Sequence, residues 1–140
     1  MIYVLDTNVL AEVMRPVPHP AVATWLRACP ADAMFTTAIS RSEILYGIRR
    51  LADGARRNRL EHAAQVMFAE EFPARVLPFD VQAADLYADL RVIRARSGRP
   101  IAVEDGMIAA IAKARGATVI TRDVGGFEGC GVAVANPWEA

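Results

Sequence analysis

The chain has 140 residues, of which 54% are hydrophobic and 23% are charged, a balance typical of one folded domain rather than of a disordered chain. Its 16 basic and 16 acidic residues give a formal net charge of zero, which excludes a uniformly basic nucleic-acid binder and leaves only local contacts with nucleic acid. Because no strongly apolar stretch approaches the roughly 18 residues of a membrane-spanning helix, we expect a single domain over residues 1–140 and no membrane contact.

The N-terminal part is predicted to contain one strand and two helices. Residues 2–5 form a short apolar run, typical of a strand covered on both faces, and the run stops at Asp6. A short helix is expected over about residues 8–14, and a second helix begins at Pro20, which suits a first helical turn, and reaches Arg27. The start of the chain lacks the basic flank, long apolar core and cleavage site of a signal peptide, so we expect a cytoplasmic protein.

The next segment is predicted to form a strand and two more helices. Residues 34–37 favour a short strand, and Ser40 then begins a helix as a Ser-x-x-Glu capping box with Glu43. A break at residues 53–54 separates this helix from a long amphipathic helix over about residues 55–72. The apolar side of the long helix is expected to carry Leu60, Ala63, Ala64, Met67 and Phe68.

The C-terminal half alternates between strands and helices. Residues 76–79 indicate a weak strand, and Asp80 then caps a helix that runs to about Ser97. One further helix and two further strands are expected over residues 103–115, 118–121 and 132–135. This alternation predicts an α/β sandwich with a mainly parallel sheet, whose ligand crevice lies at the carboxyl ends of the strands.

Four acidic residues are the candidates for chemistry. Asp6 and Asp123 follow strands, whereas Glu43 and Asp105 lie near helix starts, and in an α/β fold such positions converge on one crevice. Two carboxylates about 4 Å apart repel each other by about 4 kcal/mol at an effective dielectric constant near 20. A cluster of four therefore requires a cation or raised pKa values, and hard oxygen ligands favour Mg²⁺ or Mn²⁺ over zinc.

Each acid also has a purely structural explanation, and the sequence leaves these alternatives open. Asp6 suits the N-cap of the first helix, and the capping box alone accounts for Glu43. The dipole of its helix favours Asp105, although the neighbouring Glu104 serves that purpose equally well. Asp123 suits a turn before two glycines, or a surface ion pair with Arg122.

Several segments, in this order and spacing, resemble the PIN-domain nucleases, specifically the toxins of VapBC-type toxin–antitoxin pairs and their FitB-like branch. The resemblance covers nearly the whole chain. The segments that carry it are Tyr3-Val4-Leu5-Asp6-Thr7-Asn8, Ser40-Arg41-Ser42-Glu43-Ile44 with Gly47, Glu104-Asp105-Gly106-Met107-Ile108-Ala109-Ala110, and Val119-Ile120-Thr121-Arg122-Asp123 with Asn136-Pro137-Trp138.

The resemblance implies a three-layer α/β/α fold and Mg²⁺ or Mn²⁺ held by Asp6, Glu43, Asp105 and Asp123. It also implies cleavage of RNA phosphodiesters, a homodimer, and a cognate antitoxin whose C-terminal segment blocks the site. Many relatives carry Asn at the position of Asp123 and a further acid at the position of Gly126. Asp123 is therefore interpreted as the fourth acid, and one optional ligand position is absent.

The resulting hypothesis is hydrolysis of RNA by a metal-activated water. Side chains placed to support the acids or the phosphate are Thr7, Asn8, Ser40 and Thr121, for which ordinary capping and turn bonding is the alternative. Local contacts with RNA phosphates are assigned to Arg41, Arg91, Arg94, Arg96, Arg99 and Arg122, although such charges more often form a solvated face.

Two other functions compete with this hypothesis. In a phosphohydrolase, Asp6 would act as the nucleophile, but Asn8 occupies the second position of the Asp-x-Asp arrangement common in such enzymes. In a metal-bound but catalytically silent module, the domain would only bind other proteins. Cys29 and Cys130 lack metal-ligand spacing and are expected to be small thiols, at least half-buried, while His19 and His62 receive no role.

Overall fold

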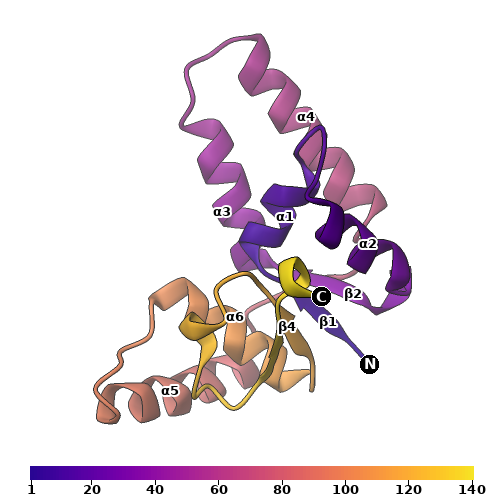
Figure 1. Ribbon diagram of the computed structural model, residues 1–140. Coiled ribbons are helices and arrows are strands. Elements are labelled where there is room, and N and C mark those ends of the chain that lie inside the picture. The colour runs from indigo at the N-terminus through magenta and orange to yellow at the C-terminus, as the bar shows by residue number, and fades with distance from the viewer.

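The computed structural model describes residues 1–140 and has one five-stranded sheet. Figure 1 shows the strands β1, β2 and β4 of this sheet among the helices. The strands are β1 (Tyr3–Leu5), β2 (Met34–Thr37), β3 (Val76–Leu77), β4 (Thr118–Ile120) and β5 (Ala133–Ala135). Their spatial order is β3-β2-β1-β4-β5, and all neighbouring strands are parallel. The predicted α/β fold is confirmed, with a sheet that is parallel throughout.

Six α-helices cover this sheet on its two faces. They are α1 (Thr7–Val13), α2 (Pro20–Ala28), α3 (Ala38–Arg49), α4 (Ala55–Glu70), α5 (Val81–Arg96) and α6 (Val103–Ala114). Three short 3₁₀ turns complete the chain: η1 (Ala31–Ala33), η2 (Gly125–Phe127) and η3 (Pro137–Glu139). None of the helices combines the length and apolar character that crossing a bilayer requires.

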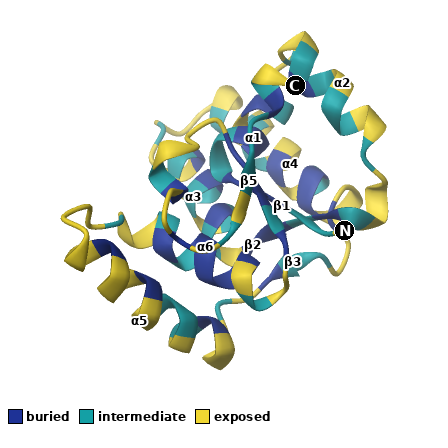
Figure 2. Cartoon of the chain, turned by 60° about the horizontal axis from the view of Figure 1, so that its bottom comes forward, coloured by how far each residue is buried: buried dark blue, intermediate teal, exposed yellow.

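Side chains that alternate between the two faces of the central strands form two separate apolar cores. Val4 and Val119 belong to the core under α5 and α6, whereas Leu5 and Ile120 belong to the core under α1, α3 and α4, because successive side chains of a strand point to opposite faces. Figure 2 shows the buried residues on the central strands and on the inner sides of α4 and α6. The molecule therefore has the three layers, helix, sheet and helix, that the resemblance implied.

The start of α3 differs from the prediction. Its N-cap is Thr37, whose Oγ1 accepts a hydrogen bond of 3.0 Å from the backbone nitrogen of Ser40. The strand β2 therefore runs directly into the helix, and the predicted capping box of Ser40 with Glu43 is wrong. Glu43 lies beyond the first turn of α3, so capping does not account for its carboxylate.

Other details of the predicted elements are confirmed or corrected by burial and capping. Asp6 caps α1 and Asp80 caps α5, as expected. The apolar side of α4 includes Ala64, Met67 and Phe68, but Ala63 is exposed, so its predicted place in the core is wrong. Both thiols are free, with Cys130 buried and Cys29 half-buried, as expected.

Two helical glycines differ in the space around them, which gives a paired prediction. A Cβ on Gly106 in α6 would lie 2.6 Å from Cε1 of Tyr87 in α5, whereas a Cβ on Gly47 in α3 would meet nothing within 4 Å. We expect Gly106→Ala to lower the free energy of unfolding by about 1–3 kcal/mol through overpacking. Gly47→Ala should raise it by about 0.5–1 kcal/mol, because alanine is the better helix former. Urea denaturation measures both values, and changes of the same sign would contradict this packing.

Candidate active site: an acidic pocket at the carboxyl edge of the sheet

The structure brings the four predicted acids together at one edge of the sheet. Asp6 directly follows β1 and Asp123 follows its parallel neighbour β4, so both lie at carboxyl ends of strands. Asp105 lies in the first turn of α6, and Glu43 projects from α3. Their proximity is evident from the electrostatics, because the charges of Asp6, Asp123 and Glu43 all raise the pKa of Asp105.

Asp6 is held in place by hydrogen bonds on both carboxylate oxygens. Only 5% of the residue is exposed. Its Oδ1 accepts from the backbone nitrogen of Thr7 at 2.8 Å, and its Oδ2 accepts from Thr121 Oγ1 at 2.8 Å. Burial raises the pKa of Asp6, and these two hydrogen bonds oppose that rise. The N-cap role proposed as an alternative is therefore real. It leaves Asp6 within a cluster of acids that we call the acidic pocket (Asp6, Glu43, Glu104, Asp105 and Asp123).

The buried hydroxyl of Thr121 links the ends of β1 and β4. It donates to Asp6 and accepts from Asn8 Nδ2 at 3.1 Å and from the backbone nitrogen of Asp123 at 3.0 Å. The amide oxygen of Asn8 in turn accepts from the backbone nitrogen of Arg122 at 3.2 Å. Thr121 and Asn8 thus fix the relative position of two acids that lie more than one hundred residues apart in sequence.

Glu43 is oriented by the residue that follows Asp6. Thr7 Oγ1 donates to Glu43 Oε1 at 2.8 Å and lies 3.0 Å from the hydroxyl of the fully buried Ser40. Burial raises the pKa of Glu43, the hydrogen bond from Thr7 lowers it, and the charge of Asp6 raises it further. Of the four predicted supporting residues, Thr7, Asn8 and Thr121 each hydrogen-bond an acid, Asn8 through its Nδ2 to Asp6 Oδ2 at 3.4 Å. Ser40 reaches Glu43 only through Thr7.

Asp105 has the most perturbed environment of the acids. Burial is the largest cause of its raised pKa, and the surrounding negative charges add to it, so that the pKa of Asp105 rises to about 6. One contributor is Glu104, which also raises the pKa of Glu43. From the sequence alone, Glu104 is only a substitute for Asp105 at the helix dipole. The signal that could have found it is the adjacent pair of acids in one first turn.

Asp123 is more exposed than Asp6 and forms the turn that was proposed for it. Its Oδ1 accepts from the backbone nitrogen of Gly126 at 3.1 Å. A Cβ on Gly126 would lie 2.6 Å from Asp123 Oδ2 and 3.3 Å from Asp105 Oδ2, so both oxygens face the same small space. The proposed ion pair with Arg122 is wrong, because Arg122 instead lies over the ring of Trp138, 5.2 Å from its centroid.

No basic side chain neutralises these acids. All four ion pairs of the chain involve other acids, namely Glu12, Glu61, Asp53 and Glu128. As the side chains are placed, however, no three His, Cys, Asp or Glu residues are close enough together to ligate one ion directly. This arrangement does not match three direct ligands, and it fits a hydrated Mg²⁺, which commonly keeps several waters and takes one or two carboxylates directly.

Comparison with known proteins agrees with the fold. The pattern of the PIN domain matches residues 3–128, and the chain belongs to the PIN domain family. It is 40% identical to toxin FitB of Neisseria gonorrhoeae, with 96% of each chain covered, and 38% identical to a VapC ribonuclease of Sinorhizobium fredii, with 97% of each covered. The crystal structure of FitAcB from N. gonorrhoeae matches with a TM-score of 0.92 and 38% identity, over 99% of this chain and 100% of that chain. The resemblance inferred from the motifs is confirmed.

Proposed function

We propose that this protein is an Mg²⁺- or Mn²⁺-dependent endoribonuclease that acts as the toxin of a type II toxin–antitoxin pair. The observation that carries the proposal is the pocket of Asp6, Glu43, Glu104, Asp105 and Asp123, which contains no ion pair to a basic side chain. Such a pocket repels an RNA phosphate unless a cation offsets the negative charge. The relatives of this chain include a protein named toxin and one named VapC ribonuclease, and these names support RNA as the substrate.

The chain's own residues supply the binding and orientation that this reaction needs. The ion would be held by Asp6, Glu43, Asp105 and Asp123, with some contacts through water. When bound, it would polarise the scissile phosphate and lower the pKa of an attacking water. The hydroxyl groups of Thr121 and Thr7 donate to Asp6 and Glu43, and these contacts would orient the two carboxylates as ligands.

The proposed partners are RNA, a cognate antitoxin and a second copy of this chain. The relative FitB is described as a toxin and was crystallised as FitAcB, which supports an assembly with an antitoxin. We expect the antitoxin to block the acidic pocket, and we expect the toxin itself to form a homodimer. Size-exclusion chromatography with light scattering, performed with and without the co-expressed neighbouring gene product, measures both associations.

Cleavage of RNA in the presence and absence of divalent ions tests the proposal. Purified, antitoxin-free protein should cut structured RNA with Mg²⁺ or Mn²⁺ and should not do so in EDTA. Hydrolysis of a small phosphomonoester without RNA cleavage would instead favour the phosphohydrolase. Absence of both activities, with retained antitoxin binding, would favour a catalytically silent interaction module.

Thermal unfolding gives a second measurement that does not need a substrate. A ligand that binds only the folded state stabilises it by RT ln(1 + [L]/Kd), or about 2.7 kcal/mol when the free ligand is 100 times Kd. We therefore expect millimolar Mn²⁺ to raise the melting temperature of the wild-type protein relative to EDTA. An unchanged melting temperature would contradict a metal site in the pocket.

A further inference from the structure

Arg94, in the last turn of α5, is the one buried arginine of the chain. Only 6% of it is exposed, and none of the ion pairs of the protein includes it. In the sequence, Arg94 belongs to a basic series expected to contact phosphates or to form a solvated face, and both expectations are wrong for this buried residue. A buried charge without a carboxylate is costly unless other polar groups replace its water, so its actual partners require an explanation.

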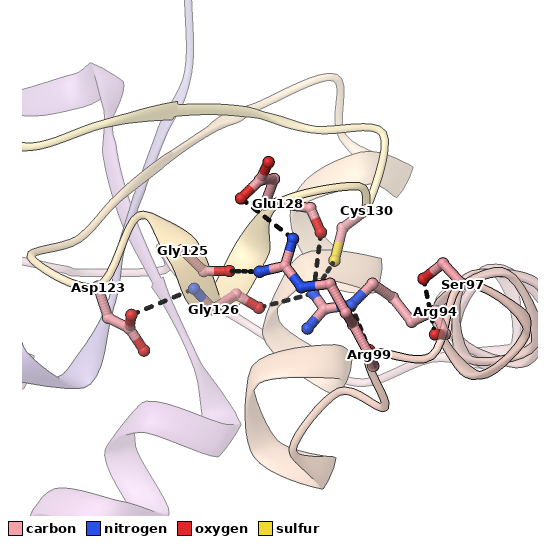
Figure 3. A network of polar contacts seen from close by, with 8 residues as sticks. All are labelled: Arg94, Ser97, Arg99, Asp123, Gly125, Gly126, Glu128 and Cys130. Atoms are coloured by element: carbon pink, nitrogen blue, oxygen red, sulfur yellow. Dashed lines mark hydrogen bonds and ion pairs between the residues drawn. The ribbon is translucent and has the colours of Figure 1, made fainter.

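The partners of Arg94 are backbone carbonyl groups of two loops (Figure 3). Its Nε donates to the carbonyl oxygen of Arg99 at 2.6 Å. Its Nη1 donates to the carbonyl oxygens of Gly126 and Glu128 at 3.0 and 2.9 Å, and it lies 3.6 Å from Cys130 Sγ. One guanidinium therefore ties the end of α5 to the connection between β4 and β5, which we call the β4–β5 connection (residues 121–132).

The β4–β5 connection is the segment that carries Asp123. Gly126 links the two side chains directly, because its carbonyl group accepts from Arg94 and its N–H donates to Asp123 Oδ1 at 3.1 Å. The other oxygen of Asp123 faces the same small space as Asp105 Oδ2. Figure 3 shows this sequence of contacts, with Asp123 on one side of Gly126 and Arg94 on the other.

We infer that Arg94 is a positioning residue for the acidic pocket: by holding the peptide groups of Gly126 and Glu128, it sets the place of Asp123 beside Asp105. This inference rests on the proposed nuclease function for its consequence in catalysis. Arg99 adds weaker contacts to the same connection, at 3.4 Å to the carbonyl oxygen of Gly125 and 3.2 Å to Glu128 Oε2, but its side chain is half exposed. The buried guanidinium therefore carries most of the restraint.

Hydrogen exchange in EDTA tests the restraint without metal or substrate. In Arg94→Gln, amide protection over residues 123–130 should fall at least about tenfold relative to the wild type, while protection in α6 and β4 stays the same. Arg99→Gln, which removes only exposed contacts, should change the same amides much less. Leu90→Val alters a buried residue of the same helix and controls for general loss of stability. Wild-type protection over residues 123–130 in Arg94→Gln would overturn the inference.

A double-mutant cycle with Asp123→Asn tests whether the restraint acts through Asp123. In the wild-type background, Arg94→Gln should lower kcat and Mn²⁺ affinity by about 10- to 100-fold, as substitutions behind metal ligands do, with KM for RNA changed little. In the Asp123→Asn background, the same change should have almost no further effect. Equal losses in both backgrounds would overturn the inference.

Arg94→Lys is the second variant, to be measured if Arg94→Gln does not fold. Arg94→Lys keeps the charge but not the paired Nε and Nη1 donors, so it should show a smaller loss in the same two measurements, and wild-type values for it in both would overturn the inference. A wild-type protein that cuts no RNA under any metal condition would overturn the proposed function, whereas the exchange data decide separately whether Arg94 holds the β4–β5 connection.

Discussion

Asp6→Asn is expected to reduce metal-dependent RNA cleavage by at least about 1,000-fold while leaving the fold intact. Asparagine is as good an N-cap as aspartate, so α1 should still begin at the same residue. The substitution removes one negative charge from the centre of the proposed metal site, where the ion contributes several kcal/mol to the transition state, and each 1.36 kcal/mol corresponds to a factor of ten in rate. Single-turnover cleavage of a structured RNA in Mn²⁺ measures the change.

Asp80→Asn is the matched control for this variant. Asp80 is the N-cap of α5 and is not part of the acidic pocket. Its Oδ1 accepts a hydrogen bond from the backbone nitrogen of Ala83 at 2.9 Å. The same chemical change at a second helix start should therefore leave cleavage at the wild-type rate. Activity of Asp6→Asn within tenfold of wild type would reject the role assigned to Asp6, and equal losses in both variants would trace the effect to capping.

Asp105→Asn is expected to change activity and stability in opposite directions. Cleavage should fall by at least about 100-fold, because an acid of the proposed metal site is lost. In EDTA at pH 8 the variant should melt about 3 to 4 °C above the wild type, the shift that roughly 1 kcal/mol produces in a domain of this size. Solvent screens part of the repulsion at the half-buried carboxylate of Asp105, so its raised pKa destabilises the fold less than it would at a fully buried acid.

The pH dependence gives this second prediction a definite sign. Because the pKa of Asp105 is raised from 3.8 to about 6 in the folded protein, the folded state binds more protons than the unfolded state between these values. The contribution of the Asp105 carboxyl group to stability is therefore fully present below pH 3.8 and is lost as the pH rises through about 6. The excess melting temperature of Asp105→Asn over the wild type should therefore develop between pH 3.8 and about 6 and vanish below pH 3.8. An exposed acid on α5 provides the control variant, Asp85→Asn, and a melting difference that is constant with pH would contradict the assignment.

The sequence was sufficient to predict the acidic pocket because its main residues occupy positions that topology dictates. Asp6 and Asp123 follow apolar strand segments, and neighbouring parallel strands end at the same edge. Glu43 was predicted for a partly wrong reason. Two overlapping cap patterns begin at Thr37 and Ser40, and local sequence does not distinguish them. The direct passage from β2 into α3 selects Thr37, which leaves Glu43 available to contact Thr7.

Arg94 could not be distinguished from its neighbours by sequence. Arg91, Arg94, Arg96 and Arg99 form one basic series near the end of α5, and periodicity does not show which of them another loop will cover. Burial of Arg94 depends on the β4–β5 connection, whose path is irregular and includes only one short 3₁₀ turn. Because no regular element beyond that turn fixes the path of the connection, the contacts of Arg94 are visible only in three dimensions.

The spatial order of the strands also bears on how such a protein is made. The strand β1 precedes the other strands in the chain, yet it lies between β2 and β4, and β4 leaves the ribosome only after all six α-helices. Until then the carboxylate of Asp6 lacks the Thr121 hydroxyl that orients it. A nascent chain that ends before Thr121 therefore carries an incomplete acidic pocket.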